Sequence, residues 1–421
     1  MLHSLLSNGS ITIMKSEQSR EFGDVRKNRI EAWRILGGGI LGMMVAMGIG
    51  RFAYTPILPL MERDLGLSHA ETGSLASFNY VGYLLGALLC TFFPKILKNV
   101  PVNVGALAAS IATTLFMGTF ASPLWWGMLR LVAGLASAIL FVVIAVEVAE
   151  ALAKRGESGI GGALYGGIGL GIALSGFLVP KLDKLGSWRE CWLGMGLIAL
   201  VLALTGLFLA QKRSATPPLE HVQGVVKEKI SGIGLLATAY CLEGFGYIIS
   251  ATFIVAMVGK TPGLEQYGSL SWVAVGLAAA PSTIIWQQTA RKFGVKRAAI
   301  LAYAIQAAGI LLSIKARTPL TVALAAISFG GTFLGIVTLV MSEGNRRAGT
   351  NGRVVAALLT ACFSAGQVVG PTLAGLVADR GGFAIPLLLA ALSVSVGGVI
   401  IATDKRFKPY HPQPLLKQEG G

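Results

Sequence analysis

Three ionisable side chains lie inside long apolar stretches of the sequence and are the first candidates for chemistry. They are Arg51, Arg130 and Glu243. An isolated charge in the hydrocarbon costs about 2.5–3.5 kcal/mol on the insertion scale, so such residues are functional candidates by default. The planar arginine fork binds a carboxylate or phosphate through two hydrogen bonds, and a carboxyl group can carry a proton. The pattern predicts that Arg51 and Arg130 bind an anionic substrate group and that Glu243 couples proton movement.

The three residues fall at similar depths if each lies on a helix that crosses a membrane. At about 1.5 Å per residue, Arg51, Arg130 and Glu243 lie roughly 24, 20 and 18 Å from the same membrane boundary. One shared site fits these depths. Two structural alternatives fit them as well: either arginine forms an ion pair with Glu243, or its charged head extends to the membrane boundary.

Polar and aromatic residues near these positions are further candidates for substrate contact. Tyr54 and Thr55 follow Arg51 at i+3 and i+4, which lie on one face of a helix. For every candidate, a hydrogen bond between helices is the alternative. Beyond the two arginines, the predicted substrate-binding set is Tyr54, Thr55, Asn79, Tyr80, Tyr83, Tyr247 and Gln367.

Membrane-spanning helices must position these side chains. Of the 421 residues, 54% are hydrophobic and 13% are charged, whereas soluble domains carry about 25% charged residues. A hydrocarbon core of about 30 Å needs roughly 20 apolar helical residues. A soluble α/β enzyme is excluded because the apolar runs are too long. Windows of the required kind lie near residues 35–60, 72–94, 102–121, 123–148, 159–180, 190–211, 231–258, 268–289, 298–315, 319–342, 354–378 and 384–403.

A charged, proline-containing gap divides the twelve windows into two sets of six. It runs from Gln211 to Lys229 and is interpreted as a linker. The sequence thus predicts an all-α membrane protein with two six-helix bundles. Its predicted parts are a cytoplasmic tail (1–34), the first bundle (35–211), a cytoplasmic linker (212–230), the second bundle (231–403) and a cytoplasmic tail (404–421).

Basic residues indicate how the chain is oriented. Lys and Arg are about three times as frequent in the loops on the side of both termini, which by the positive-inside rule is cytoplasmic. The net charge of +15 lies in these short clusters rather than on one stripe, so it indicates topology and not nucleic-acid binding. We expect a monomer in the bacterial inner membrane, with the lipid bilayer as its surroundings.

An internal repeat supports two bundles of the same kind. A G-x3-G-x4-G spacing occurs twice, about 199 residues apart, and two shorter matches recur at nearly the same offset. Because both halves have the same orientation in the membrane, they form a parallel repeat, related by an axis along the membrane normal. The matched sets are Gly167, Gly171 and Gly176 with Gly366, Gly370 and Gly375; Gly73-Ser74-Leu75 with Gly268-Ser269-Leu270; and Gly134 and Glu147 with Gly330 and Glu343.

From 35 to 403 the chain resembles the major facilitator superfamily. The segment around Gly167 resembles its antiporter motif, G-x8-G-x3-G-P-x2-G-G, although Ser158, Ile172 and Ser175 replace motif residues. The loop Ala290 to Ala298 resembles the superfamily's basic loop without its acid. Gly48 to Met61 is similar to the bacterial YbfB-like subfamily. The resemblance implies alternating access and places the first, fourth, seventh and tenth helices, with Arg51, Arg130 and Glu243, around a central cavity.

A second group of residues is predicted to act in gating. Carboxylates near basic cytoplasmic loops are expected to form ion pairs that close the cytoplasmic gate, with proton coupling as the alternative. Glycines allow close helix packing, so the bundles can rock against each other, and ordinary packing is the alternative. The predicted gating set is Glu147, Glu150, Glu343, Arg291, Gly167, Gly171, Gly176, Gly366, Gly370, Pro371 and Gly375.

No constellation for catalysis or cofactor binding is found in the sequence. The four histidines lie outside the predicted spans, and no Walker motif, G-x-S-x-G motif or metal-ligand cluster occurs. We therefore expect no enzyme activity, no cofactor and no metal. The predicted function is a proton-coupled secondary transporter of a small, anionic organic solute. The alternatives are an exporter of hydrophobic or cationic compounds and a transport-fold sensor.

Overall fold

The computed structural model describes residues 26, 28–210 and 232–407. The predicted linker (212–230) lies outside the described residues, as do most of the predicted N-terminal tail and residues 408–421. Secondary structure within the described residues is helical throughout. The predicted end of the first bundle at residue 211 and the predicted start of the second at residue 231 fall in this gap and therefore remain predictions.

Eleven described helices are long and apolar enough to cross a membrane. They are the first span (Asn28–Leu65), α3 (His69–Phe92), α5 (Pro123–Ala153), the span Ser158–Asp183 that contains α6 (Gly166–Asp183), α7 (Trp188–Ala210), α8 (Gly234–Gly259), α9 (Gly268–Phe293), α10 (Val295–Ile314), α11 (Pro319–Ala348), α12 (Gly352–Gly381) and α13 (Ala384–Thr403). A shorter helix, α4 (Val100–Phe116), packs along α5 and α7. Its 17 residues reach about 25 Å, so α4 completes the first set of six.

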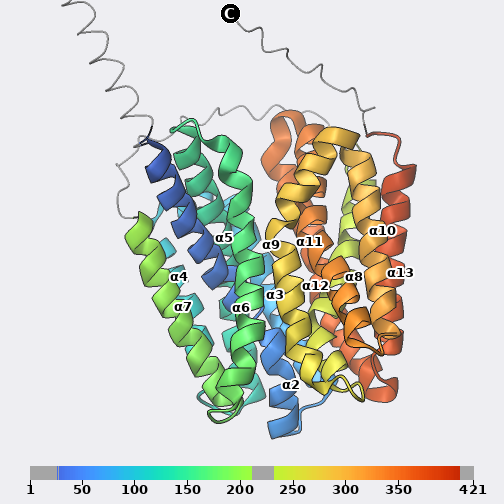
Figure 1. Cartoon of the computed structure of the whole chain (residues 1–421). Coiled ribbons are helices and arrows are strands. Elements are labelled where there is room, and N and C mark those ends of the chain that lie inside the picture. Colours follow the sequence, from blue (N-terminus) through green and yellow to red (C-terminus); the bar gives the residue numbers. More distant parts are fainter. Residues whose placement is uncertain (1–25, 27, 211–231, 408–421) are drawn as a thin grey trace, which may run out of the picture.

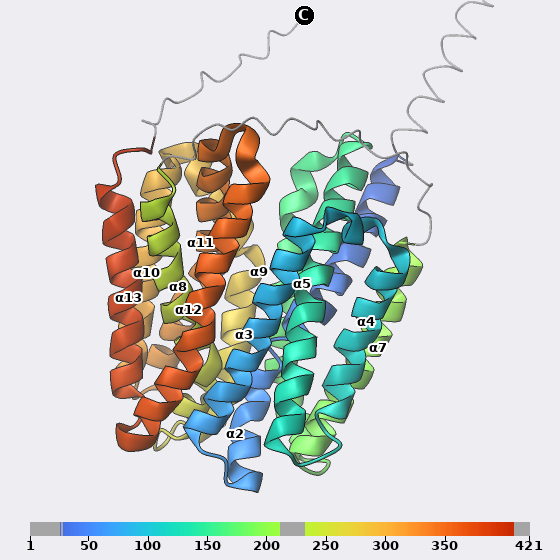
Figure 2. The same cartoon turned by 180° about the vertical axis from the view of Figure 1, so that it is seen from behind.

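The two sets of six helices form two bundles that lie side by side (Figure 1). The helix α6 packs along α9 on one side of the interface, and α3 packs along α12 on the other side, as Figure 2 shows from behind. The end of α7 and the start of α8 lie at the same end of the molecule, which we call the linker face. The end of α2 (Tyr54–Leu65) lies at the opposite face.

The predicted glycine repeat appears as a repeated packing pattern within each bundle. A Cβ atom on Gly171 would lie 2.7 Å from the Cα of Gly48 in the first span, and one on Gly370 would lie 2.7 Å from the Ile248 side chain in α8. Added Cβ atoms on Gly167 and Gly366 would likewise meet backbone oxygens of these two helices. These glycines hold equivalent helices at close range inside their own halves.

The third glycine of each set lies between the halves. A Cβ atom on Gly176 would lie 2.9 Å from the backbone nitrogen of Val273 in α9. One on Gly375 would lie 2.1 Å from the carbonyl oxygen of His69 at the start of α3. A Cβ atom on Gly73 in α3 would similarly lie only 2.3 Å from the carbonyl oxygen of Pro371 in α12. Gly176 and Gly375 therefore have equivalent roles at the interface, whereas Gly268, the match of Gly73, contacts Val255 and Gly259 within its own half.

The first span is longer than the predicted window and is broken near its middle. Residues Met44–Ile49 are π-helical, and the chain turns before α2 begins at Tyr54. The amide of Phe52 donates to the Met47 carbonyl at 3.1 Å, five residues back. Pro56 has no amide hydrogen to continue the ladder, which explains the break. The break leaves the Arg51 carbonyl without a hydrogen bond from its own helix, and such interruptions are common at functional sites.

Candidate substrate-binding site

A cavity of about 530 Å³ lies between the two halves. The first span, α3, α5 and α6 contribute one wall, and α8, α9, α11 and α12 contribute the other. On α11, the lining residues extend from Phe333 at mid-helix to Asn345, close to the helix end at the linker face. Arg51 lies at the helix break, at the inner end of the cavity. The cavity therefore runs from the middle of the membrane to the linker face.

Arg51 is a buried cation with unused hydrogen-bond donors. Its side chain is 3% exposed, and its guanidinium carbon lies 4.3 Å from the Tyr83 ring centroid and 4.7 Å from that of Tyr80. Its Nε and Nη2 atoms have no hydrogen-bond partner, and no carboxylate of a described residue is within ion-pair distance. Aromatic faces stabilise the charge, and the free donors can bind an anion.

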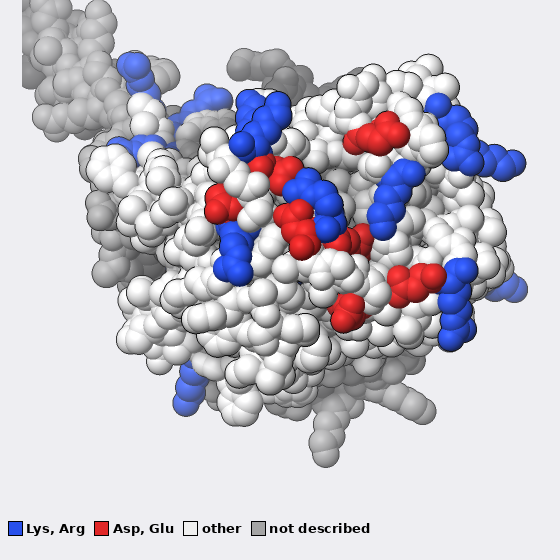
Figure 3. All heavy atoms as spheres, turned by 90° about the horizontal axis from the view of Figure 1, so that it is seen from below, with Lys and Arg blue, Asp and Glu red and all other residues white. Residues whose placement is uncertain are grey.

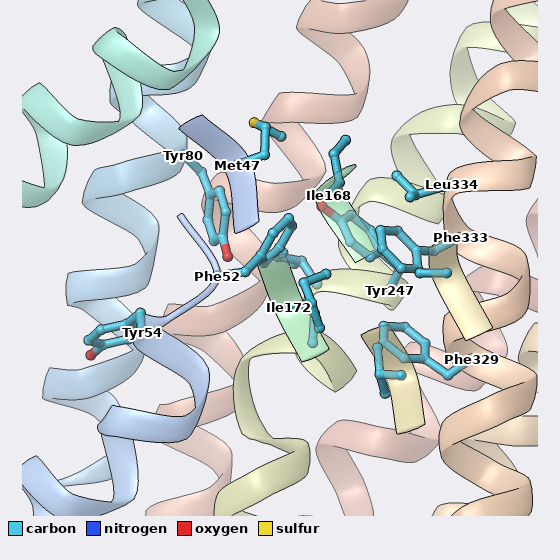
Figure 4. Packing of buried hydrophobic residues seen from close by; sticks show 14 of the residues in the cluster. Met47, Phe52, Tyr54, Tyr80, Ile168, Ile172, Tyr247, Phe329, Phe333 and Leu334 are labelled. Carbon is cyan, nitrogen blue, oxygen red and sulfur yellow. The ribbon is translucent and has the colours of Figure 1, made fainter. Parts of the chain in front are cut away.

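Facing Arg51, the second half contributes a stack of aromatic rings. The Tyr247 ring is nearly parallel to those of Phe333 and Phe363, at 5° and 8°, with centroids 5.6 and 5.3 Å away. Phe52, next to Arg51, contacts Phe333 edge to face at 6.5 Å. Figure 4 shows Phe52 between Tyr80 and the Tyr247–Phe333 pair. The stack therefore begins directly beside the arginine.

Gln367 supports this stack from behind. It is fully buried in α12 and donates a hydrogen bond from Nε2 to the Tyr247 hydroxyl. Tyr247 lines the cavity, whereas Gln367 does not. The structure thus brings the predicted residues Arg51, Tyr83 and Tyr247 to one cavity. The predicted residues Tyr80 and Gln367 are their neighbours.

Arg130 lies behind Arg51 and outside the cavity lining. It is 1% exposed, its guanidinium carbon lies 4.6 Å from the Tyr54 ring centroid, and its Nη2 donates to the Arg51 carbonyl oxygen at 3.3 Å. Asn79 Nδ2 donates to the Arg130 carbonyl oxygen at 3.0 Å. Arg130 therefore satisfies a carbonyl group that the helix break releases, as buried backbone in a membrane requires.

Tyr54 and Thr55 also lie outside the lining, on the side of Arg51 that faces away from the cavity. The Tyr54 hydroxyl donates to the Thr72 carbonyl at 2.7 Å. The Thr55 hydroxyl donates to the Ala251 carbonyl in the other half, also at 2.7 Å. In this conformation both residues hold helices together.

Glu243 is separated from the two arginines. It is fully buried and accepts a hydrogen bond from Gln306 Nε2 at 2.6 Å, while Thr332 donates to the Gln306 side-chain oxygen at 3.1 Å. Its Oε2 atom has no hydrogen-bond partner. The predicted alternative of an ion pair with Arg51 or Arg130 is not found among the described residues. Shared depth did not bring these charges together.

At the opposite face, a cluster of charged side chains closes the space between the halves. Glu62 Oε2 lies 3.1 Å from Lys260 Nζ and Glu62 Oε1 lies 2.6 Å from His69 Nδ1. Asp379 accepts from the amides of His69 and Ala70 at 2.8 and 3.0 Å. Figure 3 shows acidic and basic side chains intermingled near the middle of this face. The structure is thus closed here and open at the linker face.

Sequence reasoning missed this cluster. Lys260 and His69 both lie outside the predicted spans, so neither is among the predicted site residues. The start of α3 is signalled by a capping box of Ser68 and Glu71, but no local pattern connects α3 to Lys260, 191 residues further on.

The predicted gating carboxylate Glu343 forms no ion pair with a described residue of the first half in this conformation. Glu343 lies 2.6 Å from Arg347, its neighbour on α11, and Arg347 lies 2.7 Å from Asp404, just after α13. Burial disfavours the charge of Asp404, but the hydrogen bonds from Arg347 and from the Arg406 amide, together with the charges of these two arginines, lower the pKa of the carboxyl group below its ordinary value. These contacts all lie within the second half.

The remaining charged gating residues, Glu147, Glu150 and Arg291, lie at the open end. Glu147 and Glu150 are near the linker-face end of α5. Arg291 lines a separate cavity of about 260 Å³ beside Trp33 and Gln287. A latch between the halves at this face remains a prediction, because the structure is open there.

Several cavity-lining residues were not singled out in the sequence. Polar side chains on α11 recur at i+4 and i+3, which places them on one face of the helix, and this recurrence is the signal that could have found them. The lining residues not predicted include Phe52, Tyr165, Tyr240, Thr283, Gln287, Phe333, Thr338, Ser342, Asn345 and Phe363.

Comparisons with known proteins find related transporters. A profile of the family described as "Uncharacterised MFS-type transporter YbfB" matches residues 43–402. The "Gallate transporter" of Pseudomonas putida is 29% identical over 146 residues, which are 35% of this chain. That match spans 32% of the relative's length.

A solved structure shares the fold. The crystal structure of the nucleoside transporter NupG superposes with a TM-score of 0.67 over 89% of this chain and 100% of that chain, at 14% identity. The prediction of two six-helix bundles is thereby confirmed. Because the family profile covers most of the sequence, the chain is a multi-pass membrane transporter that belongs to the YbfB-type family of the major facilitator superfamily.

Proposed function

We propose that the protein is a proton-coupled secondary transporter that moves a small organic anion by alternating access. The observation that carries this proposal is the Arg51 guanidinium, which is buried at the inner end of the cavity with unpaired donors. A buried charge without a partner is costly. A bound anion would supply the missing partner.

Alternating access requires that the closed and open ends exchange. The contacts of Glu62 and Asp379 with the other half would break, and the linker-face ends of the bundles would approach each other. Arg51 lies between these two gates, so an anion held there becomes accessible to each side in turn. The two interfaces of α3 with α12 and of α6 with α9 are the surfaces on which the halves would rock.

Glu243 is proposed as the proton-coupling carboxyl group. It lies on α8 between Tyr240 and Tyr247, which both line the cavity. A change in its protonation would alter its hydrogen bond with Gln306 and hence the contact of α8 with α10. Proton binding would in this way be linked to the wall that faces the substrate.

The orientation that we propose for the protein in its membrane follows from the distribution of Lys and Arg residues. The linker face carries the basic loops, so we place it and both termini in the cytoplasm of a bacterial inner membrane. The cavity then faces inward. The whole site lies within one chain, which is consistent with a functional monomer. An organic acid is also the cargo named for the gallate transporter that matches part of this sequence.

A thermal-shift screen of the purified full chain tests the anion site. Carboxylic acids and phosphate esters would be compared with the neutral amides of the same acids and with lipophilic cations, at two pH values. A ligand of the native state raises the melting temperature. The variants are Arg51→Gln and, as a matched control, Arg317→Gln, which changes an exposed arginine at the opposite face.

We expect acids to stabilise the wild type and Arg317→Gln but not Arg51→Gln. If only lipophilic cations stabilise the protein, and Arg51→Gln responds equally, the anion proposal is wrong and an exporter of cationic compounds takes its place.

A further inference from the structure

We propose that the transported anion is a monoanionic aromatic carboxylate, with its carboxylate on Arg51 and its ring against the Tyr247–Phe333–Phe363 stack. This inference rests on the proposed function and specifies the substrate class of the same site. It follows from the charge of the lining, from its aromatic content and from the arrangement of the rings.

The charge of the lining fixes the charge of the ligand. Arg51 is the one charged side chain among the described residues that line the cavity. A dianion would need a second cation, and a zwitterion or cation would need a carboxylate, because an unpaired charge in a dry site is costly. A single carboxylate matches the single guanidinium fork.

The aromatic content of the lining favours a flat, apolar ligand body. Eight of the 20 lining residues are Phe or Tyr, whereas such residues and Trp make up 8% of the chain. Four of the eight, Tyr240, Tyr247, Phe333 and Phe363, come from the second half and face Arg51 across the cavity. An aliphatic acid would need only an apolar cavity surface, which leucine and valine side chains provide as well.

The arrangement of the rings adds a preferred plane. The rings of Phe333 and Phe363 lie within 8° of parallel to the Tyr247 ring. The hydrogen bond from Gln367 fixes the Tyr247 hydroxyl. Aromatic pairs prefer offset-stacked or edge-to-face contacts. A ring whose carboxylate lies on Arg51 meets Phe52 and Phe333 first, since these two rings connect the arginine to the stack.

Isothermal titration calorimetry on the purified full chain would use three probes of matched size. Benzoate has the charge and the ring, cyclohexanecarboxylate has the charge without the flat ring, and benzamide has the ring without the charge. We expect benzoate to bind about 3- to 10-fold more tightly than cyclohexanecarboxylate, the range that an aromatic contact provides. Benzamide should bind more weakly than both acids.

Two substitutions on α11 separate ligand contact from packing. Phe333→Leu removes a ring that lines the cavity, and Phe329→Leu removes its stacked neighbour, which is 5.6 Å away and outside the lining. We expect Phe333→Leu to abolish the preference for benzoate while cyclohexanecarboxylate still binds. Phe329→Leu should retain the preference.

The outcomes distinguish this inference from the proposed function. Equal binding of benzoate and cyclohexanecarboxylate, both lost in Arg51→Gln, would overturn the aromatic class and leave the anion transporter standing. The same holds if Phe333→Leu and Phe329→Leu change the preference equally. If benzamide binds as well as benzoate, or no acid binds, the anion site itself is refuted.

Discussion

The Lys260 ammonium lies 3.1 Å from the Glu62 carboxylate and joins the two halves of the transporter at its closed face. Glu62 is the centre of this contact, since it also accepts a hydrogen bond from the Thr72 hydroxyl and contacts His69. The Lys260 side chain is 53% exposed, whereas that of Glu62 is 5% exposed. The pair therefore combines a buried acceptor with a solvated partner, a contact that can form and break during a transport cycle.

Glu62→Gln is predicted to favour opening of this face. Loss of the charge removes the ion pair with Lys260 and keeps the side-chain shape, and a partly exposed pair is worth about 1 kcal/mol, or about fivefold in the population of the open state. A Thr55→Cys reporter, buried at the interface in the closed state, would be labelled with an impermeant maleimide after replacement of the native cysteines. Labelling should be about fivefold faster in Glu62→Gln.

The matched control for this experiment is Glu71→Gln. Glu71 is exposed at the same face, and its side chain bonds to Ser68 of its own capping box and to no other described residue. It should leave the labelling rate unchanged. Equal rates in the wild type and Glu62→Gln would show that the Glu62–Lys260 pair does not hold the face closed.

Glu243→Gln is predicted to separate transport from proton coupling. The amide keeps the shape of the side chain and can still bond to Gln306, but it cannot gain or lose a proton. In proteoliposomes, accumulation of the best-stabilising acid under an imposed pH gradient should fall to the background, while exchange of the same acid at equal pH should continue. Gradient-driven accumulation that persists in Glu243→Gln would place the coupling elsewhere.

Gly48→Ala is predicted to destabilise the first half. The added Cβ would lie 2.5 Å from the Cα of Gly171, and backbone cannot rotate away as a side chain can. Overpacking of this kind costs about 1–3 kcal/mol, which thermal unfolding in detergent would detect. Gly105→Ala is the control, because a Cβ there has no atom within 4 Å and improves helix propensity. Equal melting temperatures for the two variants would contradict the packing described for Gly48.

The buried pair of Asp404 and Arg347 is predicted to make stability depend on pH. Burial raises the pKa of Asp404, but the stronger combined effect of Arg347 and the Arg406 amide lowers it. A carboxyl group with a lowered pKa stabilises the folded state above its unfolded pKa of about 3.9, and this stability is lost as the pH falls through the folded pKa.

Asp404→Asn should therefore lower the melting temperature at pH 7, by at least about 2–4 °C. The difference from the wild type should shrink as the pH falls below about 4. Thermal unfolding at a series of pH values measures it. A difference that stays constant down to pH 3 would show that the charge of Asp404 is not its source.

The sequence by itself determined that the chain crosses the membrane as two bundles of six helices. Runs of about 20 apolar residues can satisfy their backbone only as helices in a bilayer, so hydropathy alone located the spans. The glycine repeat showed that the halves are alike, and its close contacts at Gly171 and Gly370 are local properties of small residues. Arg51 was found because a charge in an apolar run is conspicuous.

Only the tertiary structure decided which charged groups meet. Sequence spacing gives the depth of a residue along a helix but neither the direction in which its side chain points nor the helix it faces. Arg130 therefore donates a hydrogen bond to the Arg51 carbonyl behind the cavity. Glu243 accepts a hydrogen bond from Gln306 on α10. Glu62 and Lys260, 198 residues apart in the sequence, meet because glycine contacts bring the halves together at that face. The direction in which a side chain points from its helix axis is set by how that helix packs against the others. The residues that determine this packing are distributed over the whole chain.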